Sequence, residues 1–328
     1  MNGIARILAV LDGTDQDAVI LSKAVSLAHQ QGAALELFLC DSQCAYSLLH
    51  AYDQTNVAAF RRQSTQQSRR YLDRLRDVAV GAGVPITVDA ACESPLYEAI
   101  VHKVLRSGTD LVIKSAVSSN SRRRFALDAN DWQLMRACPA TLLLSRGGSW
   151  RACPRFVAAV DVSPSEVSEL PGMILRVSDQ LCRGSHGQLD VVYSDNAETS
   201  SAEHRRRVAK LSALAGTPEF LTEADIHVLS GAPEVALPAF AAGRGYDAVV
   251  MGALTHREGF AALVGTLTSK LIETLDCDFV LVKPESCRIG LELAATPVGA
   301  PSDESEYEVL PQPPAAPGFV TPWQLPAR

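Results

Sequence analysis

Short runs of continuous apolar residues alternate with longer amphipathic stretches over most of this 328-residue chain. The runs are rich in Val, Ile and Leu. Continuous rather than alternating apolar character is typical of strands that are buried on both faces of a sheet. We predict such strands at residues 7–11, 35–39, 84–88, 111–113, 141–144, 156–160, 189–192, 226–229, 248–251 and 279–282.

The stretches between these runs have the periodicity of amphipathic helices. They include residues 17–30, 58–80, 96–106, 167–181, 203–214 and 234–241. Parallel strands need crossover connections, so this alternation predicts parallel sheets with helices on both faces. The order of strands and helices is completed twice along the chain. We therefore predict an α/β fold made of two repeated, open, parallel five-stranded sheets.

Local matches between the two halves indicate an internal duplication. Residues 6–12, RILAVLD, align with residues 155–161, RFVAAVD, so each half opens with a strand that ends in a carboxylate. The third strand of each half runs into a turn with proline at the start of the next helix, Pro95 in one and Pro233 in the other. Proline suits this position because the first N–H groups of a helix have no intrahelical partner.

Glycine and proline mark a short linker between the halves. We predict a first domain at residues 1–147 and a second at 153–284, and so short a linker predicts that the two sheets pack against each other. Residues 285–328 are rich in proline and carry six acidic residues against two basic ones. Such a segment buries too little apolar surface to offset its chain entropy, so we expect a disordered tail.

Charge and hydropathy exclude several classes of protein. The tail contributes −4 of the net charge of −7, which leaves a nearly neutral body with no strong field for nucleic acid. The basic runs 122–124 and 205–207 are interpreted as solvated faces, and nucleic acid is not an expected partner. No apolar run approaches the roughly 20 residues of a membrane span, and the N-terminus lacks a secretory apolar region. We expect a cytoplasmic protein.

Eight cysteines are spread too thinly along the chain for a disulfide-stapled scaffold. Cys40 and Cys44 form an isolated C-x3-C pair, with no second pair and no histidine at ligand spacing nearby. Thiols in such a setting are more often small buried apolar groups than zinc ligands. We predict no metal site.

Motifs of common enzyme classes are absent from the sequence. There is no G-x4-G-K-(S/T) phosphate loop, no G-x-S-x-G nucleophile motif and no H-E-x-x-H zinc motif. The seven histidines stand singly, and no pair of groups is placed for acid–base catalysis. The sequence favours a binding protein over an enzyme, and we name no catalytic residue.

Ligands of open parallel sheets bind outside the carboxyl ends of the strands, next to the loops that follow the first and fourth strands. In the second half, the loop after the fourth strand runs from Gly252 to a helix that begins at Gly265-Thr266. Gly252 lets the backbone leave the strand tightly, and the free N–H groups at the start of a helix favour a phosphate. Gly265 and Thr266 are equally explained as a helix cap.

This loop, the double repeat and the aspartates at the strand ends resemble the universal stress protein family in its tandem form. Nucleotide-binding members of that family carry G-x2-G-x9-G-(S/T) after the fourth strand, and Gly252-x2-Thr255-x9-Gly265-Thr266 has the same spacing. The resemblance covers about residues 1–284. Thr255 stands where the family has glycine, and its branched side chain occupies space that a closely approaching phosphate needs.

The resemblance implies where an adenine nucleotide would lie. The end of the first strand would face the adenine and the end of the second would flank it, while the loop would lie near the ribose and the phosphates. The candidate binding residues are Asp161, Val162, Val192, Tyr193, Gly252, Thr255, His256, Arg257, Gly265 and Thr266. Of these, His256 and Arg257 either add positive charge at the phosphates or are simply solvated.

The first half departs from the nucleotide pattern, since its loop at residues 114–125 contains no glycine. Backbone N–H groups there are not expected to cradle a phosphate, so we interpret this half as a degenerate copy. The basic run 122–124 leaves a different anionic ligand open. Tandem members of the family likewise tend to carry Asp-Trp before the final short helix, here Asp131-Trp132.

The function that the resemblance implies is a stress-response binding module that holds ATP or a related adenine nucleotide, with or without Mg²⁺, in the second domain. The bound state would bias interactions with protein partners. Two alternatives stay open: a scaffold or a carrier of a lipid-type or nucleotide-sugar ligand, and a protein with weak ATP hydrolysis or autophosphorylation at Thr266. Homodimerisation also stays open.

Overall fold

The computed structural model describes residues 3–49, 57–116, 127–163, 166, 169–195, 200–216, 224–255, 263–264 and 266–284. The predicted tail at residues 285–328 and the basic run 122–124 lie outside these residues. Structural statements below refer to the described part of the chain.

The described helices and strands follow the predicted order in both halves. The first half contains β1 (Arg6–Leu11), α1 (Asp17–Gln31), β2 (Ala34–Cys40), α2 (Ser42–Leu49), α3 (Val57–Ala79), the 3-10 turn η2 (Val80–Ala82), β3 (Ile86–Ala91), α4 (Leu96–Ser107), β4 (Leu111–Ser115), α5 (Ala129–Ala137) and β5 (Thr141–Ser145). The second contains β6 (Arg155–Ala159), α6 (Leu170–Gly184), β7 (Gln188–Asp195), α7 (Ser201–Ala215), β8 (Ala224–Ser230), α8 (Pro233–Ala241), β9 (Ala248–Gly252), β10 (Leu254–Thr255), β11 (Leu263–Val264), α9 (Thr266–Thr274) and β12 (Asp278–Val282).

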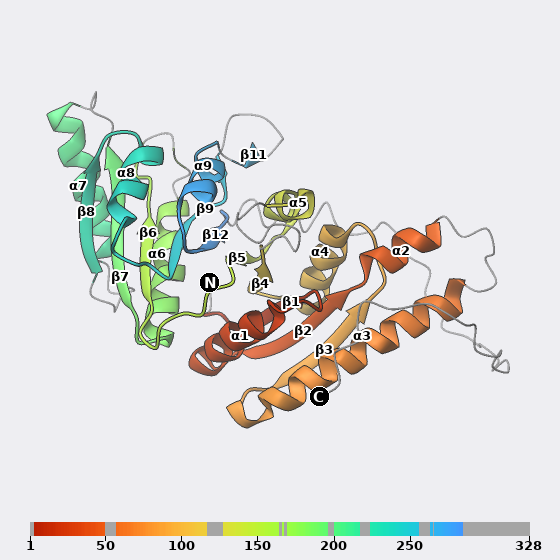
Figure 1. Cartoon of the computed structure of the whole chain (residues 1–328). Coiled ribbons are helices and arrows are strands. Elements are labelled where there is room, and N and C mark those ends of the chain that lie inside the picture. Colours follow the sequence, from red (N-terminus) through yellow and green to blue (C-terminus); the bar gives the residue numbers. More distant parts are fainter. Residues whose placement is uncertain are drawn as a thin grey trace.

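Both halves contribute to a single ten-stranded sheet, in the order β3-β2-β1-β4-β5-β12-β9-β6-β7-β8 (Figure 1). Within each half the five strands are parallel, as predicted. The expectation of two sheets packed against each other is wrong, because β5 and β12 join them edge to edge as an antiparallel pair with Leu143 opposite Val280. Every residue of both strands is buried, and buried strand edges need hydrogen-bond partners.

Helices cover both faces of the sheet, as the sequence predicted. Neighbouring strand residues point to opposite faces, so Ile7 and Leu8 belong to two separate clusters of buried side chains. The Ile7 cluster includes residues of α1, α3, α6 and α7, namely Leu27, Leu72, Leu181 and Leu211. The Leu8 cluster includes residues of α4, α5, α8 and α9, namely Ile100, Leu134, Leu237 and Leu271.

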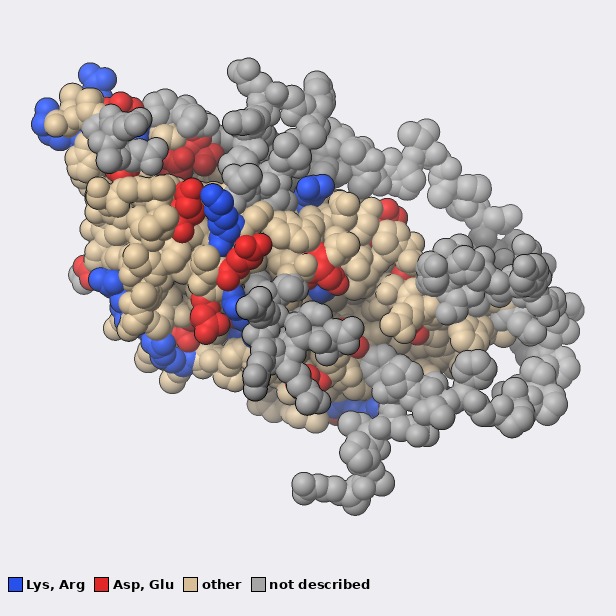
Figure 2. Space-filling model, turned by 45° about the horizontal axis from the view of Figure 1, so that its top comes forward, with Lys and Arg blue, Asp and Glu red and all other residues tan. Residues whose placement is uncertain are grey.

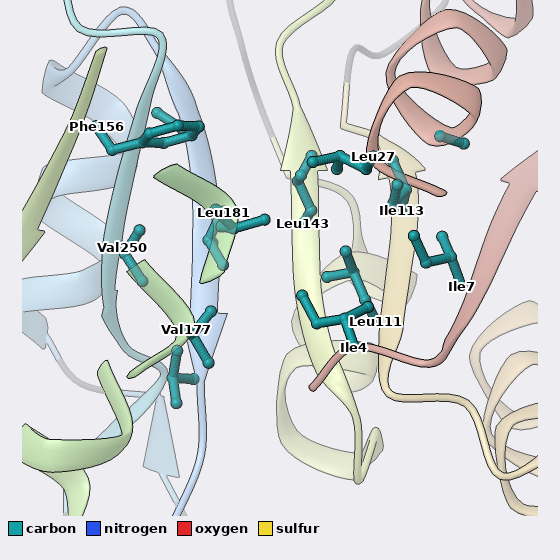
Figure 3. Packing of buried hydrophobic residues seen from close by; sticks show 14 of the residues in the cluster. Ile4, Ile7, Leu27, Leu111, Ile113, Leu143, Phe156, Val177, Leu181 and Val250 are labelled. Carbon is teal, nitrogen blue, oxygen red and sulfur yellow. The ribbon is translucent and has the colours of Figure 1, made fainter. Parts of the chain in front are cut away.

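The hydrophobic core runs through the junction of the halves without interruption. One cluster contains Leu27 and Leu143 of the first half together with Phe156, Leu181 and Val250 of the second (Figure 3). All five side chains are at most 1% exposed. The halves therefore fold against one another as one body.

Two observations concern the surface and the helices of the described part of the chain. On the face drawn in Figure 2, acidic and basic side chains are interspersed. Among the described helices, none combines the length and the apolar character that crossing a membrane requires.

Candidate nucleotide-binding crevice

A pocket of about 510 Å³ opens at the carboxyl ends of β6, β7 and β9 in the second half. Ligand pockets in proteins commonly measure roughly 300–1,000 Å³. The strand order at this place is β9-β6-β7, so the connection after β6 runs to one side of that strand and the connection from β8 to β9 returns to its other side. Such a switch point is where open parallel sheets leave a crevice for a ligand.

Four of the predicted site residues line this one pocket, although they come from three different strands or strand ends. They are Asp161, Val192, Tyr193 and Gly252. Most of the remaining walls are apolar: Ala159, Val160, Ile174, Leu229, Pro233, Leu237, Met251, Leu267 and Leu271. Ser163, Glu166, Ser194, Arg207 and Thr268 complete the lining.

Asp161 lies two residues beyond the end of β6, and its exposed side chain stands at the rim of the pocket. Its Oδ1 accepts a hydrogen bond from the backbone N–H of Ser163 at 2.8 Å, which fixes the turn after the strand. Val162 is buried, and its carbonyl oxygen accepts from Nζ of Lys210 at 3.4 Å. The turn thus holds the carboxylate beyond the end of β6, where it lines the pocket.

A network of hydrogen bonds and ion pairs lies beside Val192 and Tyr193. Nη1 of Arg207 donates to the Tyr193 hydroxyl at 2.8 Å and to Oδ1 of Asp195 at 3.0 Å, and Nη2 pairs with Glu203. Nδ1 of His204 lies 2.6 Å from Oδ2 of Asp195. Burial raises the pKa of Tyr193 above its ordinary value, so its hydroxyl stays neutral.

Sequence reasoning missed this network. It interpreted the basic run 205–207 as solvated, which holds for the exposed Arg205 and Arg206 but is wrong for Arg207, whose side chain is 17% exposed. It also gave His204 no specific partner, and interpreted each histidine only as a surface or satisfied polar residue. The i,i+4 spacing of Glu203 and Arg207 was a local signal for their pairing, whereas the contacts to Asp195 depend on the fold.

Gly252 ends β9 in a tight space. A Cβ added there would lie 2.9 Å from Cδ2 of Leu170, closer than real Cβ contacts come. The carbonyl oxygen of Gly252 accepts a hydrogen bond from Oγ1 of Thr268 at 3.4 Å, which ties the strand end to the first turn of α9. Leu267 and Thr268 in that turn also line the pocket.

The two ends of the loop after β9 are paired. Leu254 lies opposite Val264 and Thr255 opposite Leu263 in the antiparallel ladder of β10 and β11, so the backbone at Thr255 is brought close to the start of α9 at Thr266. The predicted residues His256, Arg257 and Gly265 lie outside the described part of the chain, as do the side chains of Thr255 and Thr266.

Comparison with known proteins finds one family whose model matches both halves of the chain. A model of the Universal stress protein family matches residues 3–146 and 171–283. The chain belongs to the universal stress protein family. Universal stress protein E of Escherichia coli (strain K12) is 23% identical over 310 residues, which cover 87% of this chain and 96% of that protein.

Solved structures share the fold over most of the chain. One from Pseudomonas aeruginosa UCBPP-PA14 superimposes with a TM-score of 0.69 at 21% identity and covers 89% of this chain and 98% of its own. A universal stress protein from Archaeoglobus fulgidus DSM 4304 has a TM-score of 0.63 at 11% identity, with 85% and 98% covered. At these identities the likeness is one of fold.

The two crevices of this tandem universal stress protein differ in what fills them. The register of the strands makes Lys114 of β4 equivalent to Met251 of β9, and Nζ of Lys114 lies 2.8 Å from Oδ1 of Asp131 on α5. Phe38, which is fully buried, is likewise equivalent to Val192. A lysine paired with an aspartate thus stands where the second half has the pocket residue Met251, and an aromatic ring stands where it has the smaller Val192.

Asp131 of the Asp131-Trp132 pair has a structural role. Asp128 and Asp131 form a reciprocal capping box at the start of α5, and the Lys114 ammonium pairs with the same Asp131 carboxylate. Burial nevertheless raises the pKa of Asp131. The aspartate therefore anchors the start of α5 and ties it to β4.

Proposed function

We propose that the second-half crevice binds an adenine nucleotide such as ATP, and that the bound state biases the contacts of this cytoplasmic protein with its partners. The observation that carries the proposal is the convergence of Asp161, Val192, Tyr193 and Gly252 on one pocket. These residues come from three separate segments of the sequence, and the family pattern selected all four without reference to the pocket.

The crevice offers a suitable environment for a purine. Val192, Leu229, Leu237 and Met251 provide apolar surface for the faces of a planar base, and such surface dominates most small-molecule sites. At the rim, the carboxylate of Asp161 accepts hydrogen bonds, as the exocyclic amine of adenine requires.

The phosphates would extend toward the first turn of α9. Unpaired backbone N–H groups and the positive end of the helix dipole favour anions at such a position. The rim also carries the acidic side chains of Asp161 and Glu166, which disfavour bare phosphates and favour a nucleotide that arrives with Mg²⁺.

Gly252→Ala tests the proposal. Gly252 lines the pocket at the end of β9, and a Cβ added there would press on the Leu170 side chain. Gly148→Ala is the matched control, since a Cβ there meets nothing within 4 Å. We expect Mg²⁺–ATP to raise the melting temperature of the wild type and of Gly148→Ala in a concentration-dependent manner, and to raise that of Gly252→Ala much less. Equal shifts in all three proteins, or none in the wild type at millimolar ATP, would contradict the proposal.

The predominantly apolar lining favours a second candidate, a carrier of a ligand with an apolar chain. Mass spectrometry of the small molecules released on denaturing freshly purified protein separates the two. Stoichiometric ADP or ATP supports nucleotide binding, whereas a lipid-type or nucleotide-sugar molecule supports the carrier.

A further inference from the structure

Two cysteine thiols meet in the first half, outside the crevice discussed above. Sγ of Cys92 lies 2.7 Å from Sγ of Cys44. Cys44 belongs to α2, and Cys92 follows the end of β3, 48 residues later in the chain. Both residues are buried, at 6% and 8% exposed, and form a small cluster of their own with Ala45.

The geometry points to a reversible covalent link, and we propose that Cys44 and Cys92 form a disulfide when the protein meets a peroxide. Sulfur atoms in a disulfide lie about 2.05 Å apart, so a shift of less than about 1 Å separates the present contact from the bond. The fold already places the two chain segments, and only the thiol hydrogens have to leave.

An opening to solvent reaches the thiol pair. A pocket of about 190 Å³ is lined by Cys92 and by side chains that include Arg61, Glu98 and His102. A pocket of this size admits a molecule as small as hydrogen peroxide. Cys92 lines the pocket and Cys44 does not, so Cys92 meets the peroxide first and Cys44 serves as the resolving thiol. The guanidinium of Arg61 favours the thiolate form of Cys92.

The chemistry proceeds in two displacements. The Cys92 thiolate attacks one oxygen of the peroxide, the O–O bond breaks, and the departing hydroxide takes up a proton to give water and a Cys92 sulfenic acid. The Cys44 thiolate then attacks the Cys92 sulfur, the S–O bond breaks, and a second hydroxide leaves as water. Two thiols are oxidised and one peroxide is reduced to two molecules of water.

The reaction is slow at neutral pH, because burial raises the pKa of the Cys92 thiol to about 12 and only the thiolate is nucleophilic. Asp41 also disfavours the anion, and Arg61 opposes both effects. The pair therefore responds to sustained oxidant rather than to a brief pulse. The disulfide would fasten α2 to the turn between β3 and α4, at the carboxyl edge of the first-half sheet.

Cys40 provides the internal control. It lies near the pair on β2, but its thiol donates to the carbonyl oxygen of Glu93 at 3.3 Å. Cys153 in the exposed linker is a second control, because it is far more accessible to oxidant than either buried thiol.

The test uses the full chain, exposed to hydrogen peroxide until its mass no longer changes, then acid-quenched, alkylated and digested with trypsin without reduction. We expect peptide 24–61 to be linked to peptide 77–103, and dithiothreitol to reverse the link. The link should persist in Cys40→Ser and Cys153→Ser and be lost in Cys44→Ser and Cys92→Ser. In urea-unfolded wild type, the eight thiols should pair without this preference.

Two results would overturn the proposal. One is a wild-type digest in which both thiols are alkylated, or carry only sulfinic acid, at every exposure. The other is a link that survives in Cys44→Ser or that forms just as selectively in the unfolded chain. The first of these results is read from the wild-type protein alone, so it stands even where a variant fails to fold.

Discussion

Nζ of Lys23 lies 2.5 Å from Oδ2 of Asp278, an ion pair between residues that are 255 positions apart in the chain. Both side chains are at most 4% exposed. Asp278 also accepts hydrogen bonds from Nε1 of Trp150 at 2.7 Å and from the backbone N–H of Arg146 at 2.9 Å. Lys23 also donates to Oγ of Ser145 at 2.7 Å. This network joins the first half, the linker and β12 of the second half.

Lys23→Met should lower the free energy of unfolding by about 3 kcal/mol, because it leaves the Asp278 carboxylate buried without its cation. Urea unfolding measures this change. Lys270→Met is the control. It breaks the ion pair between Glu234 and Lys270, whose side chain is 58% exposed, and should lower the free energy of unfolding by less than about 1 kcal/mol. A Lys23→Met protein as stable as the wild type would show that the buried pair does not fasten the halves.

Asp17 predicts a pH dependence of stability. Its carboxylate accepts from the Tyr71 hydroxyl and from the backbone N–H of Gly13, both at 2.8 Å, yet burial raises its pKa to about 6. Between the unfolded pKa and this value, only the native state holds the proton. The contribution of Asp17 is therefore fully present below pH 4 and is lost as the pH rises through 6.

Relative to Asp17→Asn, the wild type should gain about 1 kcal/mol of unfolding free energy when the pH falls from 7 to 5. Urea unfolding of both proteins at the two pH values measures the difference, and other titrating groups cancel in the comparison. Parallel changes in the two proteins would mean that Asp17 is already ionised at pH 5.

The network beside the crevice makes neighbouring arginines unequal. Arg207→Leu removes charged hydrogen bonds to Asp195, Glu203 and the Tyr193 hydroxyl, and should lower the free energy of unfolding clearly more than the neighbouring substitution Arg206→Leu does. Arg206→Leu, at an exposed position of the same helix, should change it by no more than about 0.5 kcal/mol. Equal effects in thermal or urea unfolding would contradict the assigned network.

Most of the fold could be predicted because buried parallel strands and amphipathic helices leave strong local patterns. β3 lies at Ile86–Ala91, later than the predicted 84–88, because Pro85 precedes the strand and Asp89 within it pairs with Lys103. The helix predicted from residue 167 begins at Leu170, with Pro171 in its first turn. α2 was not predicted from the sequence.

The joining of the two sheets could not be predicted from the sequence. The apolar pattern of β5 and β12 requires burial on both faces, but it is the same whether the neighbour is parallel or antiparallel and whichever half supplies it. The partner of each strand depends on how the complete halves meet, and no local pattern records that.

The candidate site was predictable where it depends on strand ends. Asp161 and Gly252 follow directly from the strand–loop pattern, and the family resemblance added Val192 and Tyr193. The apolar walls, such as Leu229 and Leu271, looked like any other core residue, since neither their type nor their spacing distinguishes a pocket wall from a packed interior. Their role appears only when the helices are placed around the crevice.

Calorimetric titration of the full chain with Mg²⁺–ATP is the most direct test of the central claim, that the second-half crevice binds an adenine nucleotide. Val192→Phe copies the first half by placing an aromatic ring in the pocket, and Val192→Ile is the conservative control. We predict one site per chain in the wild type and in Val192→Ile, and affinity at least about tenfold weaker in Val192→Phe. No binding to the wild type, or binding that Val192→Phe leaves unchanged, would contradict the claim.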